Sequence, residues 1–118
     1  MNRARTALLV GGDLGARARV DAAASGTGVT VVTTTPERMA DAMRSDSLDF
    51  VILDLDTGRE RVLQALQDAR ADGSAPNQVV GYFSHIDREL GEAARRAGCR
   101  AVPRGAFWRD LPALFAEG

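Results

Sequence analysis

The 118-residue sequence contains no lysine and only one each of cysteine, histidine, tyrosine and tryptophan. A lone cysteine, Cys99, excludes a disulfide within the chain, and together with His85 it supplies too few ligands for a zinc site. No apolar run approaches the roughly 18 residues needed to cross a bilayer, and the first twelve residues are too short an apolar stretch for a secretory signal. We therefore expect a cytoplasmic protein without membrane association.

The sequence also lacks any region whose charges are all of one sign. All 15 basic residues are arginine, they are scattered along the chain, and 16 acidic residues bring the formal net charge to −1. A protein that binds the phosphate backbone usually gathers its basic residues on one face, so direct nucleic-acid binding is not expected. The length fits one domain, and we expect residues 1–118 to form it.

Apolar runs alternate with segments of helical spacing throughout the chain. The runs predict five strands, at Ala7 to Val10, Val29 to Thr33, Leu48 to Leu53, Val79 to Phe83 and Arg100 to Pro103. The segments between and after them predict helices at Leu14 to Ser25, Pro36 to Arg44, Arg59 to Ala71, Asp87 to Ala97 and Ala106 to Ala116. Strands without an alternating polar face are buried on both sides, and helices between them cross over to a parallel sheet. The sequence therefore predicts one doubly wound (βα)5 α/β domain.

Several element boundaries carry their own signals. The triplet Thr35-Pro36-Glu37 combines a capping hydroxyl, a proline at the first helical position and an acid in the first turn. Glycines at 26, 73 and 98 each follow a predicted helix, where a positive φ satisfies the last carbonyls. Proline is tolerated only in the first turn of a helix, so Pro112 predicts that the regular part of the last helix begins near Asp110.

Polar and glycine residues follow the predicted strands at the edge where a doubly wound sheet binds its ligands. They are Gly11, Gly12 and Asp13 after the first strand, Asp54 and Asp56 after the third, Ser84 and His85 after the fourth, and Arg104 after the fifth. Because the carboxyl ends of parallel strands meet at one edge, we expect this set to form the functional site. Simpler readings remain for two of them: Asp54 as a strand-end cap and Ser84 as a helix cap.

The run Val51-Ile52-Leu53-Asp54-Leu55-Asp56, with Ser84 after the fourth strand, Arg104 after the fifth and Gly98 before it, resembles the response-regulator receiver family (CheY-like). The resemblance covers essentially the whole chain. It implies a flavodoxin-like parallel sheet of order 2-1-3-4-5. It also implies that Asp54 stands at the phosphoacceptor position, that Ser84 is the hydroxyl that moves to bind the phosphoryl group, and that Arg104 replaces a lysine.

Two departures from the family pattern point to a degenerate member, a pseudo-receiver. Gly11 and Gly12 stand where the family places the acid pair that binds Mg²⁺, and Ala101 replaces an aromatic residue of the switch. Phosphoryl transfer depends on a metal to neutralise developing charge. We therefore expect phosphorylation at Asp54 to be lost or weakened, no cofactor and no enzymatic activity, and signalling through contact with a partner protein or effector domain. Arg104 is expected to hold Asp54 in an ion pair.

Other interpretations stay open at this point. A conventional phosphoacceptor receiver would use a weakened Mg²⁺ site at Asp13, Asp54 and Asp56, and the amides of Gly11 and Gly12 offer an anion site without metal. The stretch from Leu8 to Arg17 also resembles the strand, glycine turn and helix of a nucleotide-binding Rossmann-like enzyme. Val10 occupies the first glycine position there, no acid closes the second strand, and a short-chain dehydrogenase would need a lysine that the chain lacks.

The adjacent aromatic residues Phe107 and Trp108 cannot both point directly inward from one helix. We expect one of them to face solvent or a partner, with partial burial against the fourth helix as the alternative. Receiver-like domains commonly pair through their last two helices, so the resemblance implies a homodimer through this region. Cys99 is expected to pack as a small apolar group and His85 to lie in a loop.

Overall fold

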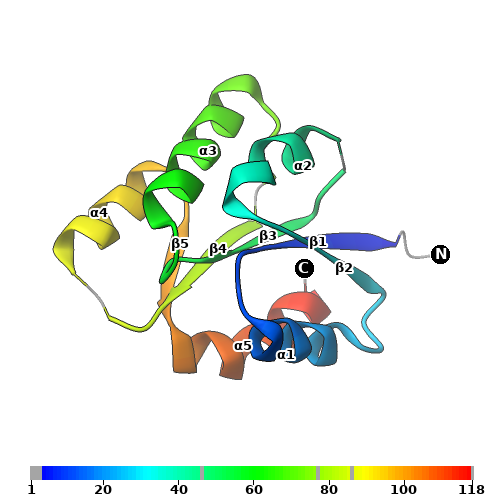
Figure 1. Ribbon diagram of the computed structural model, residues 1–118. Coiled ribbons are helices and arrows are strands. Elements are labelled where there is room, and N and C mark those ends of the chain that lie inside the picture. The colour runs from blue at the N-terminus through cyan, green and yellow to red at the C-terminus, as the bar shows by residue number, and fades with distance from the viewer. Residues whose placement is uncertain (1–3, 46, 77, 86, 118) are drawn as a thin grey trace.

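The chain forms a five-stranded parallel sheet with helices on both faces (Figure 1). The structure is a computed structural model and describes residues 4–45, 47–76, 78–85 and 87–117. Its strands are β1 (Arg5–Val10), β2 (Val29–Thr34), β3 (Phe50–Asp54), β4 (Gln78–Phe83) and β5 (Arg100–Pro103). They lie in the order β2-β1-β3-β4-β5, which confirms the predicted doubly wound sheet.

Two helices cover one face of the sheet and three cover the other. The helical segments are α1 (Leu14–Ala24), the 3-10 turn η1 (Pro36–Arg38), α2 (Met39–Ser45), α3 (Arg59–Asp72), α4 (Arg88–Arg96) and α5 (Arg104–Glu117). Figure 1 shows α1 and α5 below the sheet, and α2, α3 and α4 above it. This arrangement buries both faces of the central strands, as uninterrupted apolar runs require.

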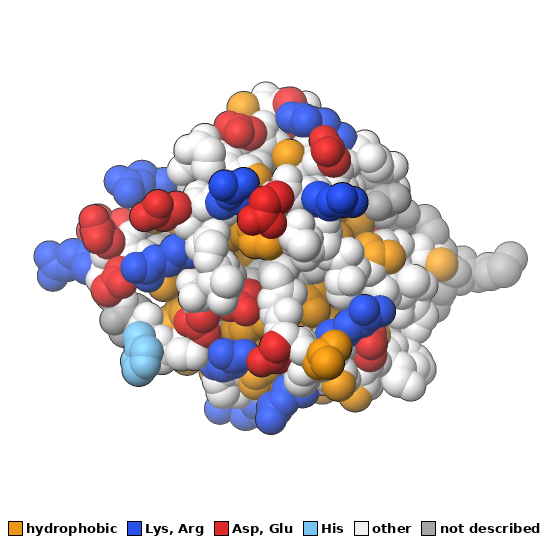
Figure 2. Space-filling model, viewed as in Figure 1, with side chains coloured by type: hydrophobic (Ala, Val, Ile, Leu, Met, Phe, Trp, Pro, Cys, Tyr) orange, Lys and Arg blue, Asp and Glu red, His pale blue; other side chains and the backbone are white. Residues whose placement is uncertain are grey.

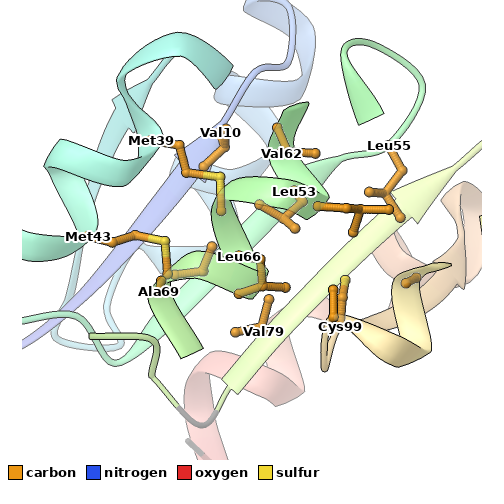
Figure 3. Close-up of a cluster of buried hydrophobic side chains, with 14 of the residues drawn as sticks. Val10, Met39, Met43, Leu53, Leu55, Val62, Leu66, Ala69, Val79 and Cys99 are labelled. Carbon is orange, nitrogen blue, oxygen red and sulfur yellow. The ribbon is translucent and has the colours of Figure 1, made fainter. Parts of the chain in front are cut away.

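The alternation of side chains along β1 divides the core into two clusters. Leu8 and Val10 belong to the cluster beneath α2, α3 and α4, whereas Ala7 and Leu9 belong to the cluster that α1 and α5 cover. Every residue of β3 is buried. Figure 3 shows the first cluster, in which Leu66 of α3 lies among side chains from β1, β3, β4 and α2. The strand ends that hold the predicted site are therefore fixed by packing on two sides.

The last helix corrects the prediction made from Pro112. It begins at Arg104, runs to Glu117 and contains Pro112 in its interior, instead of becoming regular near Asp110. Proline there removes one hydrogen bond to the carbonyl of Trp108. The helix continues because Phe107, Leu111 and Phe115, spaced by four residues, are all buried against the sheet. Burial of this stripe outweighs the lost hydrogen bond.

The boundary signals around the other helices are partly confirmed. The glycines at 26, 73 and 98 have φ values of 78°, 81° and 80°, as the predicted C-terminal positions require. Pro36 does start the second helical segment, but its first turn is a 3-10 turn, and Thr35 makes no side-chain capping bond. The extended Thr35 backbone still accepts from the N–H of Arg38 through its carbonyl, so the turn closes without the hydroxyl.

The charges of the surface are mixed. Figure 2 shows arginine and acidic side chains interspersed over the visible face, with hydrophobic side chains in small areas between them. None of the helices in the described part of the chain combines the length and hydropathy that crossing a membrane requires. The visible face therefore presents no broad basic surface of the kind that binds a nucleic-acid backbone.

The close packing of β4 gives a test of the core. A Cβ added at Gly81 would lie 2.5 Å from Cδ1 of Leu55 and 3.0 Å from Sγ of Cys99, whereas one at Gly91 in α4 would meet nothing within 4 Å. We expect Gly81→Ala to lower the free energy of unfolding by about 1–3 kcal/mol through overpacking. The matched variant Gly91→Ala should raise it by about 0.5–1 kcal/mol, because alanine favours the helix. Urea denaturation measures both, and equal effects of the two variants would contradict the packing described here.

Candidate functional site

Asp54 lies at the carboxyl end of the most deeply buried strand. Its neighbour on β4 is Tyr82, and the backbone N–H of Leu55 donates to the carbonyl of Tyr82 at 2.9 Å. The Asp54 side chain is only 6% exposed. A carboxylate at that depth needs a hydrogen-bond donor, and its Oδ1 atom accepts from the backbone N–H of Asp56 at 2.9 Å. The turn after β3 thus folds back onto the acid that ends the strand.

Asp56 is the centre of the polar contacts at this edge. Its Oδ2 atom accepts from the hydroxyl of Ser84 at 2.8 Å and from Nη1 of Arg104 at 3.1 Å. Its Oδ1 atom accepts from the backbone N–H of Ser84 at 2.8 Å. Arg104 also lies 3.4 Å from the Ser84 hydroxyl oxygen. Residues from the ends of β3, β4 and β5 therefore form one connected network, which we call the Asp56 network (Asp56, Ser84 and Arg104).

This network corrects the expected partner of Arg104. The guanidinium was expected to pair with Asp54, but its ion pair is with Asp56. The Arg104 and Asp56 side chains are 36% and 27% exposed, whereas Asp54 is buried. The charged Arg104 guanidinium pairs more readily with Asp56, which keeps access to water, than with Asp54, which the sheet encloses. Sequence spacing alone could not distinguish two acids that are only two residues apart.

The two glycines after β1 have a conformation that favours glycine. Their φ values are +77° at Gly11 and +84° at Gly12, in the left-handed region where a Cβ is unfavourable. A Cβ at Gly11 would lie 3.3 Å from the Cβ of Asp54, and one at Gly12 would lie 3.3 Å from the hydroxyl oxygen of Tyr82. The backbone therefore leaves little room for side chains at the two positions where the resemblance would place acids.

Tyr82 is a site residue that the sequence analysis missed. Its side chain is fully buried, with its ring 5.2 Å from that of Phe107, 5.1 Å from that of Trp108 and 5.1 Å beneath the guanidinium of Arg104. Its hydroxyl is a buried side-chain atom without a hydrogen-bond partner in the described part of the molecule. Burial, followed by the nearby charge of Asp54, raises the pKa of this phenol well above its ordinary value. The sequence signal that could have pointed to Tyr82 was a large side chain one residue before the end of β4.

The residues present do not fit a Mg²⁺ site of the family type. Gly11 and Gly12 offer no carboxylate, and Asp13 uses its Oδ1 atom to cap α1 by accepting from the N–H of Ala16 at 2.8 Å. Asp56 is engaged by Ser84 and Arg104. Within the described residues, no three His, Cys, Asp or Glu side chains are grouped closely enough to hold a metal ion. The acids at Asp13, Asp54 and Asp56 are thus each satisfied separately by protein donors.

The remaining candidates are dispersed around this edge. Phe107 is buried in the core, so of the two aromatic interface candidates only Trp108 keeps partly exposed surface. Trp108 contacts Tyr82 and lies beneath Arg19 of α1, at 5.4 Å, instead of packing against the fourth helix.

Three further residues singled out in the sequence, His85, Cys99 and Ala101, lie in or next to β4 and β5. His85 is exposed in a bend, and Ala101 is partly buried within β5. Cys99 is buried among apolar side chains, as expected, and burial raises the pKa of its thiol to about 12. The exposed ring of His85 and the small side chain of Ala101 add no hydrogen bond to the Asp56 network among the contacts described.

Comparison with known proteins supports the architecture. A response regulator from Thermotoga maritima superposes with a TM-score of 0.75 at 15% sequence identity, covering 98% of this chain and 100% of that one. A response regulator in red light signaling of R. palustris gives a TM-score of 0.65 at 12% identity, covering 96% and 90%. The chain has the fold of response-regulator receivers. No family model and no curated sequence matches it significantly, so the likeness lies in the fold.

The partner of Arg104 can be tested by double-mutant cycles. We expect the Arg104→Gln and Asp56→Asn pair to show a coupling energy of about 0.5 kcal/mol, typical of a partly exposed ion pair. The matched cycle of Arg104→Gln with Asp54→Asn should show a smaller coupling, since the ion pair that Arg104 makes is with Asp56. Free energies of unfolding from urea denaturation give both values. A larger coupling to Asp54 would contradict the geometry.

The unpartnered hydroxyl of Tyr82 predicts an unusual response to Tyr82→Phe. Removing a buried donor that lacks an acceptor should raise the free energy of unfolding by about 1 kcal/mol at neutral pH. Because folding raises the pKa of Tyr82 above its ordinary 10.0, the folded state opposes ionisation of the phenol, so this group causes no pH-dependent loss of stability below pH 10 and lowers the free energy of unfolding as the pH rises further. The variant should lack that part of the alkaline loss. A decrease in stability at neutral pH would show that the hydroxyl has a partner.

Proposed function

We propose that this chain is a pseudo-receiver: a cytoplasmic signalling domain that acts by protein contact, with phosphorylation at Asp54 lost or much weakened. The observation that carries the proposal is the Asp56 network. Asp56 accepts hydrogen bonds from both the Ser84 hydroxyl and the Arg104 guanidinium. By the family resemblance, these are the two side chains that would bind a phosphoryl group on Asp54.

The network places a carboxylate where a phosphoryl group would find its donors. A charge-assisted hydrogen bond to a carboxylate is stronger than a neutral one, and Asp56 makes such bonds with three donor groups. A phosphoryl group on Asp54 would have to displace them and would bring more negative charge beside Asp56. The Asp56 carboxylate therefore takes the place that the phosphoryl group of a phosphorylated Asp54 would take, and it holds the ends of β4 and β5 in one arrangement.

The glycines after β1 support the same conclusion from the opposite side of Asp54. Phosphoryl transfer depends on positioned cations that neutralise charge on the transferred group. At Gly11 and Gly12 the chain provides no acids to hold a divalent cation, and both backbones lie in a conformation that disfavours them. Reaction at Asp54 would then rely on Arg104, which is already paired with Asp56. On this basis no enzymatic step and no cofactor are required of the domain.

A domain with a fixed site transmits its signal by the surface that it presents. We place the contact surface on α5 and the neighbouring α1, where Trp108 of α5 keeps a partly exposed indole beside Arg19 of α1. Aromatic and arginine side chains commonly anchor protein interfaces. The partner is a protein or an effector domain, and a second copy of the chain bound through this α1 and α5 surface is the simplest case.

One observation favours a conventional phosphoacceptor as the second candidate. Asp54 remains at the end of β3, and only its Oδ1 atom has a protein donor among the described contacts. The other carboxylate oxygen would be the nucleophile if a phosphoryl donor reached it. The two candidates differ in whether an adduct forms at Asp54, which a direct experiment decides.

Intact mass spectrometry after incubation with acetyl phosphate and Mg²⁺ tests the proposal. We expect no phosphoryl adduct on the wild-type chain or on Asp54→Asn, because the acid pair is absent and the side chains that would bind the phosphoryl group, Ser84 and Arg104, are bonded to Asp56. A conventional receiver treated in parallel shows that the reagents are active. A stoichiometric adduct that disappears in Asp54→Asn would falsify the pseudo-receiver assignment and establish the second candidate.

A further inference from the structure

A cleft outside the Asp56 network lies on the other side of β1. The loop from β1 into α1 forms one wall and the end of β2 with η1 forms the other, and the open space between them is about 940 Å³. This volume is at the upper end of the range for small-molecule sites. The cleft also lies outside the carboxyl ends of adjacent parallel strands, where open α/β sheets bind ligands.

The charges that line the cleft favour an anion. Arg17 of α1 and Arg38 of η1 come from opposite walls, and Asp13 is the acidic residue of the lining, which leaves one net positive charge. Arg38 makes no ion pair with any described residue, and Arg17 has only an exposed contact of 3.8 Å with Asp21. Two arginines in the lining of one cleft offer planar guanidinium donors that match phosphate oxygens.

Hydroxyl groups and an apolar rim complete the lining. Thr33, Thr34 and Thr35 follow one another at the end of β2, and Thr35 makes no capping bond with its side chain. Leu14 at the start of α1 is 85% exposed, an unusual position for a large apolar side chain, and it lines the same cleft. A ligand that fits this surface carries an anionic group for the arginines and an apolar or ring portion for Leu14.

The N-terminus of α1 is not the basis of this site. The Asp13 carboxylate already caps it through the N–H of Ala16, which leaves the arginine and threonine side chains as the anion's partners. Gly12 and Gly15 do occupy the second and third glycine positions of G-x-G-x-x-G, between a strand and a helix. The absence of an acid at the end of β2 removes the usual ribose contact of that motif, and Arg38 stands nearby instead.

We infer that this cleft binds a small phosphorylated ligand of the nucleoside monophosphate class, with the phosphate between Arg17 and Arg38 and the base over Leu14. Ligand binding here gives the domain an input that does not involve modification of Asp54. The inference does not depend on the fate of Asp54, because binding in the cleft and adduct formation at the aspartate are measured separately.

Titration of the ¹⁵N-labelled chain with adenosine monophosphate, inorganic phosphate and adenosine tests the assignment by NMR. With the monophosphate we expect saturable amide shifts at Gly12, Leu14 and Thr33–Thr35. Inorganic phosphate should shift the same residues at higher concentration, and adenosine should leave them unchanged. Equal affinity for inorganic phosphate and the monophosphate would show that the cleft binds only the phosphate group, and it would overturn the nucleoside part of the inference.

Matched arginine variants locate the binding. Arg38→Gln should weaken binding of the monophosphate about tenfold or more, because a charge-assisted contact is lost, and Arg17→Gln should act in the same direction. Arg61→Gln changes the charge equally on an exposed face of α3 outside the cleft, and it should leave the affinity unchanged. Absence of saturable shifts with either phosphate compound, or equal weakening by all three variants, would overturn the inference.

Discussion

Negative charge gathered at the ends of the strands is the constraint on which this end of the molecule depends. Three acids follow the strands at this edge, and the buried one, Asp54, is costly unless hydrogen-bond donors or a cation compensate its charge. The structure compensates each acid separately: Asp54 through the N–H of Asp56, Asp56 through Ser84 and Arg104, and Asp13 through the first turn of α1. Under the proposed function, acids that each have a protein donor of their own do not share a cation, and this distinguishes the site from one that binds Mg²⁺.

The same compensation restricts what Asp54 can do. Arg104 is a planar fork where the family resemblance implies a lysine, and a fork can contact a carboxylate and a hydroxyl together. Here it lies within reach of both Asp56 and Ser84, above the ring of Tyr82. Any new anion on Asp54 must compete with contacts already present within the chain. Under the proposed function, the loss of the acid pair and the presence of the Asp56 network are two aspects of one electrostatic arrangement.

Sequence periodicity was sufficient for the architecture because every residue of β3 is buried and the runs 7–10 and 79–83 in the strands beside it contain no charged residue, as a sheet covered on both faces requires. It also predicted that Asp54, Ser84 and Arg104 lie at one edge of the sheet, since parallel strands end together. The prediction from sequence failed where contacts between distant segments determine the structure. Pro112 lies inside a helix because the free energy gained by burying an apolar stripe exceeds the cost of one lost hydrogen bond. Arg104 pairs with Asp56 because Asp56 is more exposed than Asp54. Tyr82 was missed because its importance comes from the space beside Gly12, which no local pattern records.

The glycine turn after β1 has different consequences on its two sides. Toward β3, under the proposed function, the absence of acids disfavours the divalent cation on which phosphoryl transfer relies. Toward β2, the same absence leaves Arg17 and Arg38 opposed only by Asp13, so that the cleft there is positive where two more carboxylates would have made it negative. A single pair of substitutions would thus disfavour a bound cation on one side of the strand and favour a bound anion on the other. A regulatory input that moved from covalent modification to ligand binding would require this change of sign.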